Sequence, residues 1–287
     1  MLNAKTVKLE AGLYFVATPI GTARDITLRA LDILASADVL AAEDTRSMRR
    51  LMDIHGIPLG DRPLLSYHDH NGARARPKLM QFLAEGRSVA YASEAGTPLI
   101  ADPGFDLSKE ASSEGYLVTS APGPTAIATA LTLAGLPTDK FLFVGFLPNT
   151  KAARISAIEA VREVPATLVF YESPKRVAAM LANSLTVLGD RPAAVCRELT
   201  KKFEEVRRGT LSELIASVKE RPPKGEIVVV IDRAGKATVN ESDLEEDLRE
   251  ALGRMSVKDA SEMVAGVHGI PRRKVYQLAL AMDRTDE

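Results

Sequence analysis

Short apolar runs alternate with amphipathic stretches over most of the chain. The first run, 13–19, is rich in aromatic and β-branched residues and stops at Pro19 and Gly21, which predicts a buried strand. The stretch 25–37 carries apolar residues at helical spacing, so it predicts a helix with Asp25 as its N-cap. The same alternation predicts further strands at 38–43, 64–68, 88–93 and 116–122, separated by helices at 45–56, 73–85 and 105–115.

A second alternating series follows the Pro-Gly-Pro break at 122–124 and a helix at 125–135. It predicts strands at 141–148, 167–173, 193–199 and 226–233, a candidate strand at 204–209, and helices at 150–163, 174–188 and 210–220. Strands that alternate with helices are typical of mostly parallel sheets covered on both faces. The chain is therefore predicted to form two α/β domains, 1–121 and 122–235, with mostly parallel sheets.

The segment 236–287 has a different character, because a polar, acidic stretch leads into three short predicted helices. Ser256 and Asp259 form a capping signal, and a Gly-Ile-Pro turn separates the last two helices. The apolar positions that predict their buried faces are Val257, Ala260, Met263, Val264, Val267, Val275, Leu278, Ala279 and Met282. This pattern predicts a linker and a helix-turn-helix-like module of the kind that binds nucleic acids. Arg272, Arg273 and Lys274 begin its second helix, where a nucleic-acid reader places cations; a small capping domain with a solvated basic turn is the alternative.

Composition limits the function classes. The 287 residues include 37 Lys and Arg and 38 Asp and Glu, so the net charge of −1 excludes a surface that is cationic throughout. Cys196 is the single cysteine, which excludes an intrachain disulfide and a cysteine metal cluster. The first residues do not resemble a secretory signal, and no apolar run reaches the roughly 20 residues of a membrane span, so a cytoplasmic protein is expected.

The standard nucleotide and metal motifs are missing from the sequence. There is no GxGxxG after the first strand and no Walker loop, which disfavours a Rossmann dinucleotide site and a P-loop nucleotidase. His68 and His70 flank Asp69, but no third nitrogen ligand is near in sequence, so no metal site is predicted.

Three loops rich in Gly and Pro, 18–22, 93–104 and 121–126, follow predicted strands. Ligands of open α/β sheets bind at the carboxyl edge of the strands, and small residues let the backbone approach a ligand closely. Such loops could hold a flat, mostly neutral ligand through backbone N–H and C=O groups; the alternative is that Gly and Pro merely form tight turns.

Polar side chains gather beside these loops, at the ends of buried strands. The clusters are Glu43, Asp44 and Arg46; His68, Asp69, His70 and Asn71; Tyr171, Glu172, Lys175 and Arg176; Arg197, Glu198, Lys201 and Lys202; and Lys224 and Glu226. Clusters at one sheet edge favour a cleft over a solvated surface.

In this order, the segments LYFVATPIGTARDITLRAL, AAEDTR, HDHN, SEAGTPLIADPG, PGPTAIATAL, GFLP, FYESPKR, RELTK and KGE resemble the tetrapyrrole-methylase superfamily. They are most similar to its ribosomal branch, whose members methylate the ribose 2′-hydroxyl of a cytidine in the decoding region of 16S rRNA. The resemblance covers roughly residues 12–283. One departure is Glu94, which stands where the family has Asp and adds a methylene group.

The resemblance implies that S-adenosylmethionine binds in the cleft between the two α/β domains, largely to backbone. The implied cofactor-binding residues are Ile20, Ala95, Gly96, Thr97, Ile100, Thr125, Ala126, Glu172 and Leu199. It also implies a cytoplasmic homodimer whose partner is 16S rRNA or the small ribosomal subunit.

Methyl transfer requires alignment of two substrates, which lowers a barrier by about 7–11 kcal/mol, whereas a general base contributes about 10²–10⁴-fold. The candidate proton acceptors are the carboxylates Glu94, Asp102, Asp44 and Glu198. The candidates for contacting the RNA are Asp44, Arg46, Arg176, Arg197, Lys201 and Lys202, and His70 and Asn71 are candidates for orienting the target nucleotide. Two alternatives stay open: a methylase of a tetrapyrrole precursor and a non-enzymatic nucleic-acid-binding regulator.

Overall fold

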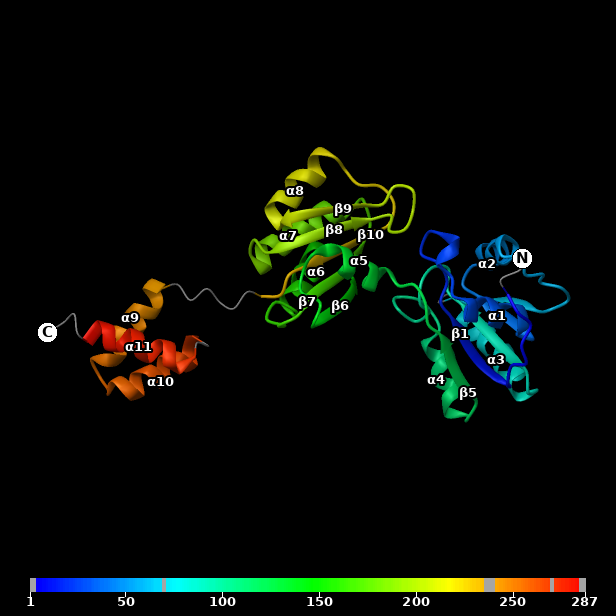
Figure 1. The fold of residues 1–287 in the computed structure, drawn as a ribbon, viewed down its shortest axis with the longest axis horizontal. Helices are drawn as coiled ribbons and strands as arrows, with labels where there is room; N and C mark the ends of the chain where they lie inside the picture. Colours follow the sequence, from blue (N-terminus) through cyan, green and yellow to red (C-terminus); the bar gives the residue numbers. More distant parts are fainter. Residues whose placement is uncertain (1–3, 69–70, 235–240, 269–270, 284–287) are drawn as a thin grey trace. The chain divides into compact units, whose positions relative to one another are not determined.

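The computed structural model describes residues 4–68, 71–234, 241–268 and 271–283. The chain forms two compact units, Met1–Asp232 and Arg233–Glu287 (Figure 1). Unit 1 contains both sheets, and unit 2 contains the three last helices. None of the described helices is both long enough and apolar enough to cross a membrane.

The first sheet has the strand order β3-β2-β4-β1-β5, and every adjacent pair in it is parallel, as predicted. Its strands are β1 (Gly12–Val16), β2 (Val39–Ala42), β3 (Leu64–Ser66), β4 (Ser88–Ala92) and β5 (Leu117–Ala121). The helices between them are η1 (Ala23–Asp25), α1 (Leu28–Ser36), α2 (Thr45–Ile54), α3 (Gly72–Ala84) and α4 (Phe105–Ser113). The strands β1, β2 and β4 are buried along their whole length, which explains why they read as continuous apolar runs.

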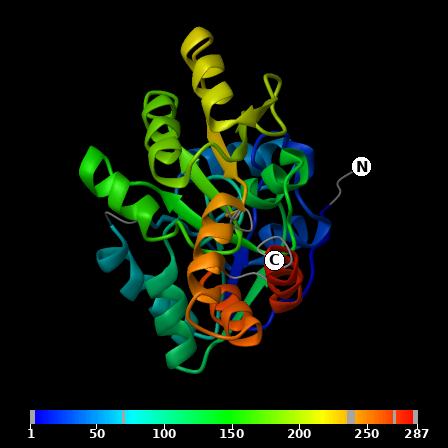
Figure 2. The same cartoon turned by 90° about the vertical axis from the view of Figure 1, so that its left-hand side faces the viewer.

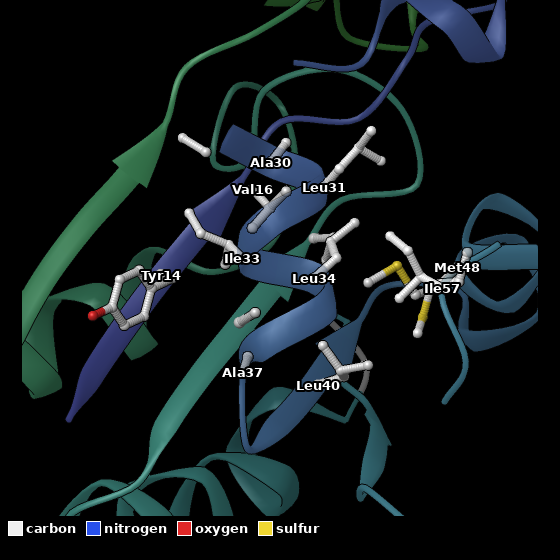
Figure 3. Packing of buried hydrophobic residues seen from close by; sticks show 14 of the residues in the cluster. Tyr14, Val16, Ala30, Leu31, Ile33, Leu34, Ala37, Leu40, Met48 and Ile57 are labelled. Atoms are coloured by element: carbon white, nitrogen blue, oxygen red, sulfur yellow. The ribbon is translucent and has the colours of Figure 1, made fainter. Parts of the chain in front are cut away.

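Helix α1 shows how the apolar pattern becomes a core. Leu31 and Leu34 lie on its buried face and pack toward Val16 of β1 and Leu40 of β2 (Figure 3). Burial of one such side chain contributes about 1.5–3 kcal/mol. The predicted N-cap is wrong: Thr27 caps α1 by accepting a hydrogen bond from the Ala30 N–H, and Asp25 belongs to η1.

The second sheet has the strand order β6-β7-β10-β8-β9. Its strands are β6 (Phe141–Phe146), β7 (Thr167–Glu172), β8 (Pro192–Arg197), β9 (Glu205–Thr210) and β10 (Ile227–Ile231). Its helices are α5 (Ala126–Ala134), α6 (Lys151–Glu159), α7 (Val177–Leu188) and α8 (Leu211–Glu220).

The expectation of a mostly parallel sheet is wrong for this second sheet, since only β6 and β7 pair in parallel. The connection 198–204 between β8 and β9 is too short for a parallel crossover, which needs a dozen or more residues, so β9 runs back antiparallel. Strand β10 runs between β7 and β8 in the opposite direction. Ile227 at its start therefore pairs with Glu172 and Arg197 at the ends of those strands, which brings three polar clusters to one sheet edge.

Unit 2 consists of α9 (Glu241–Leu252), α10 (Val257–His268) and α11 (Arg272–Asp283), drawn orange to red in Figures 1 and 2. The predicted cap is present, because the Asp259 N–H donates to Ser256 Oγ at 3.2 Å. The predicted buried face of α10 is partly wrong: Val264 is buried, but Met263 and Val267 are 46% and 72% exposed. Three short helices cover only a narrow stripe of α10, so the edges of its apolar face stay in solvent.

Candidate cofactor and substrate cleft

A cleft of about 690 Å³ opens in unit 1, where loops that follow strands of both sheets meet. This volume lies within the range of about 300–1,000 Å³ for small-molecule sites. All nine implied cofactor-binding residues line it: Ile20, Ala95, Gly96, Thr97, Ile100, Thr125, Ala126, Glu172 and Leu199. The structure thus brings residues from five separate segments to one cavity, and their contacts with a ligand stay a prediction.

Direct hydrogen bonds join the three loops of the first half. Thr18 and Gly96 exchange backbone hydrogen bonds of 2.9 and 3.0 Å, and Thr97 Oγ1 donates to the Pro124 carbonyl at 3.0 Å. Gly96 has a φ of +85°, and a Cβ there would lie 3.4 Å from the Ile20 side chain. Glycine is therefore suited both to the backbone conformation and to the close contact.

Strained backbone is concentrated in two loops beside the cleft. Among the residues that the structure describes, the non-glycine positions with positive φ are Leu99 (+71°), Ala101 (+58°), Glu198 (+48°) and Thr200 (+61°). Ala101 lines the cleft, and the other three are neighbours in sequence of lining residues. Such conformations cost about 1–3 kcal/mol each and are found at ligand sites, because surrounding contacts must hold them.

A clasp between the first loop and the β8–β9 loop closes one wall of the cleft. Thr22 donates to Thr200 twice: its N–H to Oγ1 at 3.2 Å and its hydroxyl to the carbonyl at 2.6 Å. A Cβ at Gly21 would lie only 2.5 Å from Thr200 Oγ1 and 2.9 Å from the Leu199 carbonyl. Gly21 is required here because its backbone touches the opposite loop.

Glu198 begins the β8–β9 loop and stabilises it, but it is not among the residues that line the cleft. Its carboxylate accepts from the Glu226 N–H at 2.9 Å and from Lys201 Nζ at 3.1 Å. The Glu226 hydrogen bond, followed by Lys201, holds the pKa of Glu198 below its usual value. A carboxylate with a lowered pKa is a weaker base. The two hydrogen bonds give Glu198 a role in positioning the β8–β9 loop, and its predicted catalytic role stays a prediction.

The other three candidate proton acceptors differ in their placement. Asp44 is the N-cap of α2, where hydrogen bonds from Arg46 lower its pKa, and it does not line the cleft. Glu94 lines the cleft, and its N–H donates to Glu43 Oε2 at 3.2 Å. Asp102 also lines the cleft. Two of the four candidates, Glu94 and Asp102, therefore face the cavity.

Two residues of β7, Tyr171 and Glu172, are partly or fully buried beside the cleft, which the sequence pattern did not predict. Burial, and then the charge of Asp102, raise the pKa of Tyr171 to about 12, while a hydrogen bond with Thr125 opposes this. Glu172 is buried, and its Oε2 has no hydrogen-bond partner within the described part of the chain. Tyr171 and Glu172 stand in the quoted FYESPKR motif, but burial becomes apparent only in the fold.

The arginines expected to hold phosphates are engaged with the protein itself. Arg176 donates to Asn149 Oδ1 at 2.7 Å and to the carbonyls of Leu147 and Pro148, and its Nε lies 3.2 Å from Glu172 Oε1. It therefore fixes the loop after β6, and its predicted contact with a phosphate stays a prediction.

Arg197 likewise has a protein partner, Glu205, at 3.4 Å. Lys201 lines the cleft but is bonded to Glu198 and Glu226. Lys202 is exposed, and its Nζ lies 5.5 Å from the centre of the Phe203 ring.

The remaining predicted RNA contacts are not among the residues that line the cleft, or they fall outside the described residues. Asn71 accepts from the His68 N–H at 2.8 Å and donates to the Ser66 carbonyl at 3.1 Å, and His70 lies outside the described residues. The Arg46 side chain is 90% exposed and pairs with Asp44 at 3.3 Å. Arg272, Arg273 and Lys274 are exposed at the start of α11 in unit 2, where Arg272 pairs with Glu262 at 3.5 Å.

The fold and the cleft, whose walls are glycine-bearing and strained loops beside two sheets, agree with the family to which the sequence is similar. The family model described as Tetrapyrrole (Corrin/Porphyrin) Methylases matches residues 12–215, and the chain belongs to this family. Residues 238–283 match a second model, described as the RsmI C-terminal HTH domain.

Within this family, the curated relatives carry a more specific name. A protein of Mesorhizobium japonicum is 46% identical over 96% of this chain and 94% of its own length, and one of Halalkalibacterium halodurans is 42% identical over 93% of each chain. Both are named ribosomal RNA small subunit methyltransferase I. The structure also resembles the crystal structure of uroporphyrin-III-C-methyltransferase from Thermus thermophilus, with a TM-score of 0.55 and 21% identity over 77% of this chain and 94% of that one; this likeness concerns the fold alone.

Proposed function

We propose that this protein is an S-adenosylmethionine-dependent methyltransferase of the cytoplasm that modifies the ribose 2′-hydroxyl of a cytidine in the decoding region of 16S rRNA. The observation that carries the proposal is the cleft: nine residues taken from the family motifs line one cavity of about 690 Å³. The nearly full-length match to relatives named for the small-subunit rRNA supports the substrate class.

The cleft has the chemistry that S-adenosylmethionine needs. Ile20, Ile100 and Leu199 provide apolar walls for a flat adenine ring. The buried carboxylate of Glu172 is paired with Arg176 at 3.2 Å, so Glu172 would contact the ligand through its backbone. When bound, this cofactor supplies a methyl group whose bonding electrons return to the sulfur as the oxygen–carbon bond forms. The residues that would hold it are the nine that line the cleft.

The protein must also align the hydroxyl and accept its proton. Alignment of the two substrates lowers the barrier by about 7–11 kcal/mol, whereas a general base accelerates the reaction about 10²–10⁴-fold, which is the smaller effect. The strained loops that position the substrates are therefore the main catalytic feature. Glu94 and Asp102 are the two candidate carboxylates that face the cavity, and either could take the proton of the 2′-hydroxyl. Glu94 keeps the charge of the family's Asp and reaches one methylene further.

The proposal extends to the partners. Unit 2 presents Arg272, Arg273 and Lys274 on its surface, and contacts of such cations with phosphates supply much of the affinity of proteins for RNA. We assign an RNA-binding role to this helical unit and a homodimeric state to the enzyme, both implied by the sequence motifs.

The test is methylation of 30S subunits purified from cells that lack this modification, with isotope-labelled S-adenosylmethionine. The expected product is labelled 2′-O-methylcytidine, identified by mass spectrometry after digestion of the 16S rRNA to nucleosides. Label on a base, or no label in 16S rRNA, would refute the assignment. A spectral change on addition of a tetrapyrrole and the cofactor would favour the tetrapyrrole methylase instead.

A further inference from the structure

A smaller hollow of about 170 Å³, here called the side pocket, opens next to the main cleft. The two hollows share Pro19, Gly21, Ser47 and Glu94. Ala23 of η1 and Arg50 and Ile54 of α2 are among the residues that line the side pocket only. Because the hollows share one wall, a ligand in the side pocket would lie directly beside a ligand in the cleft.

The side pocket combines apolar walls with a cationic rim. Ile54 is 55% exposed at its margin. Arg46, Arg49 and Arg50 are exposed at helical spacing of three and four residues along α2, so their side chains share its solvent face. Arg46 is paired with Asp44, whereas no ion pair of Arg50 is found among residues 4–68, 71–234, 241–268 and 271–283. Arg50 is thus available to an anionic ligand at the pocket.

From this geometry we infer that the side pocket receives part of the target nucleotide, with Arg50 on an adjoining phosphate; the inference rests on the proposed function. A reacting oxygen must approach the methyl carbon to about 3–3.5 Å, so the ribose has to bind against the donor cleft, and a hollow that shares a wall with the cleft meets this requirement. A volume of about 170 Å³ is below that of a whole-ligand site, about 300–1,000 Å³, but is suited to one portion of a nucleotide.

The composition of the pocket also fits an unstacked nucleotide. Proteins recognise single-stranded RNA by holding splayed-out bases against apolar surfaces and phosphates against arginine. Pro19 and Ile54 provide the apolar surface and Arg50 the guanidinium. Glu94 lies in the shared wall, where its carboxylate can reach the hydroxyl of a nucleotide bound there. The competing explanation is a packing gap between η1 and α2, which the His55 Nε2 contact with the Ala23 carbonyl, at 2.9 Å, holds together.

The test compares Arg50→Ala with its neighbour Arg49→Ala, an exposed arginine of the same helix that does not line the pocket. The probe is a fluorescently labelled, single-stranded RNA of five nucleotides with a central cytidine, titrated against the full chain with saturating S-adenosylhomocysteine. We expect Arg50→Ala to weaken binding about tenfold. The slope of log K against log salt should fall by about 0.7, the value for one phosphate contact on a single strand. Arg49→Ala should change the affinity less than twofold.

A second variant, Ala23→Phe, fills the side pocket without altering the charge. It should also weaken RNA binding about tenfold, while the affinity for S-adenosylhomocysteine, measured by calorimetry, stays that of the wild type for all three variants. Equal effects of Arg49→Ala and Arg50→Ala, an inert Ala23→Phe, or no RNA binding by the wild type would each overturn the inference. Labelling of 30S subunits by the wild type separates the two claims: pocket-dependent RNA binding without methylation would refute only the proposed function.

Discussion

Gly225 offers a sharp test of how the cleft is held, because an added Cβ would collide with the carboxylate that fixes the β8–β9 loop. Gly225 has a φ of +84°, and its Cβ would lie 2.2 Å from Glu198 Oε1. The left-handed backbone costs a residue with a Cβ about 1–2 kcal/mol. The collision would in addition displace Glu198 from its bonds with Glu226 and Lys201. Hydrogen bonds to charged groups contribute about 1.5–3 kcal/mol, and the lower end applies because Glu198 is in contact with solvent.

Gly225→Ala should therefore lower the free energy of unfolding by about 3 kcal/mol. Gly86→Ala is the matched control, since Gly86 has a φ of +74° and nothing within 4 Å of its Cβ position. Its cost should be about 1.5 kcal/mol. At about 2–4 °C per kcal/mol for a unit of this size, calorimetric melting should show a decrease of about 6–12 °C for Gly225→Ala and about 3–6 °C for the control.

A double-mutant cycle identifies the cause of that difference. In a Glu198→Ala background the colliding carboxylate is gone, so Gly225→Ala should cost no more than Gly86→Ala does. The reasoning is refuted if Gly225→Ala and Gly86→Ala are equally destabilising in the wild-type background. It also fails if the excess cost persists after removal of Glu198.

Three further predictions concern the cleft, unit 2 and pH. If Glu94 accepts the proton, Glu94→Gln should lower kcat about 10²–10⁴-fold with little change in the affinity for S-adenosylmethionine. Glu94→Asp, which keeps the carboxylate, should retain most of the rate. Full activity of Glu94→Gln would shift the role to Asp102. A chain that ends at Asp232 should bind 16S rRNA more weakly in filter assays but keep its calorimetric affinity for the cofactor; loss of cofactor binding would make unit 2 a structural cap. Hydrogen bonds from the Ser88 side chain and backbone hold the pKa of Asp38 below its usual value. The stabilisation is therefore complete above the pKa of the unfolded chain and is lost as the pH falls through the lower pKa of the folded protein. Urea unfolding of Asp38→Asn should accordingly lose less stability between about pH 4 and pH 2 than the wild type, and identical pH profiles would contradict this role.

The sequence predicted the parts of the site that depend on a motif and its position after a strand. All nine implied cofactor residues line the cleft because each ends, follows or begins an element whose pattern could be read locally. It did not predict the intramolecular partners of Arg176, whose guanidinium donates to the carbonyls of Leu147 and Pro148. The side pocket and Arg50 had no motif at all, and only the packing of η1 against α2 reveals them.

Local order was determined by the sequence itself. The apolar periodicity of segments such as 28–36 and 88–92 specifies a helix and a buried strand, because these patterns depend on neighbours a few residues apart. The tertiary structure alone decided which way β10 runs and which groups meet across the cleft. Thr22 bonds to Thr200, 178 residues away, and Glu226 lies 28 residues from the carboxylate of Glu198 that it satisfies. Such contacts depend on how whole elements pack, and no local pattern of side chains encodes them.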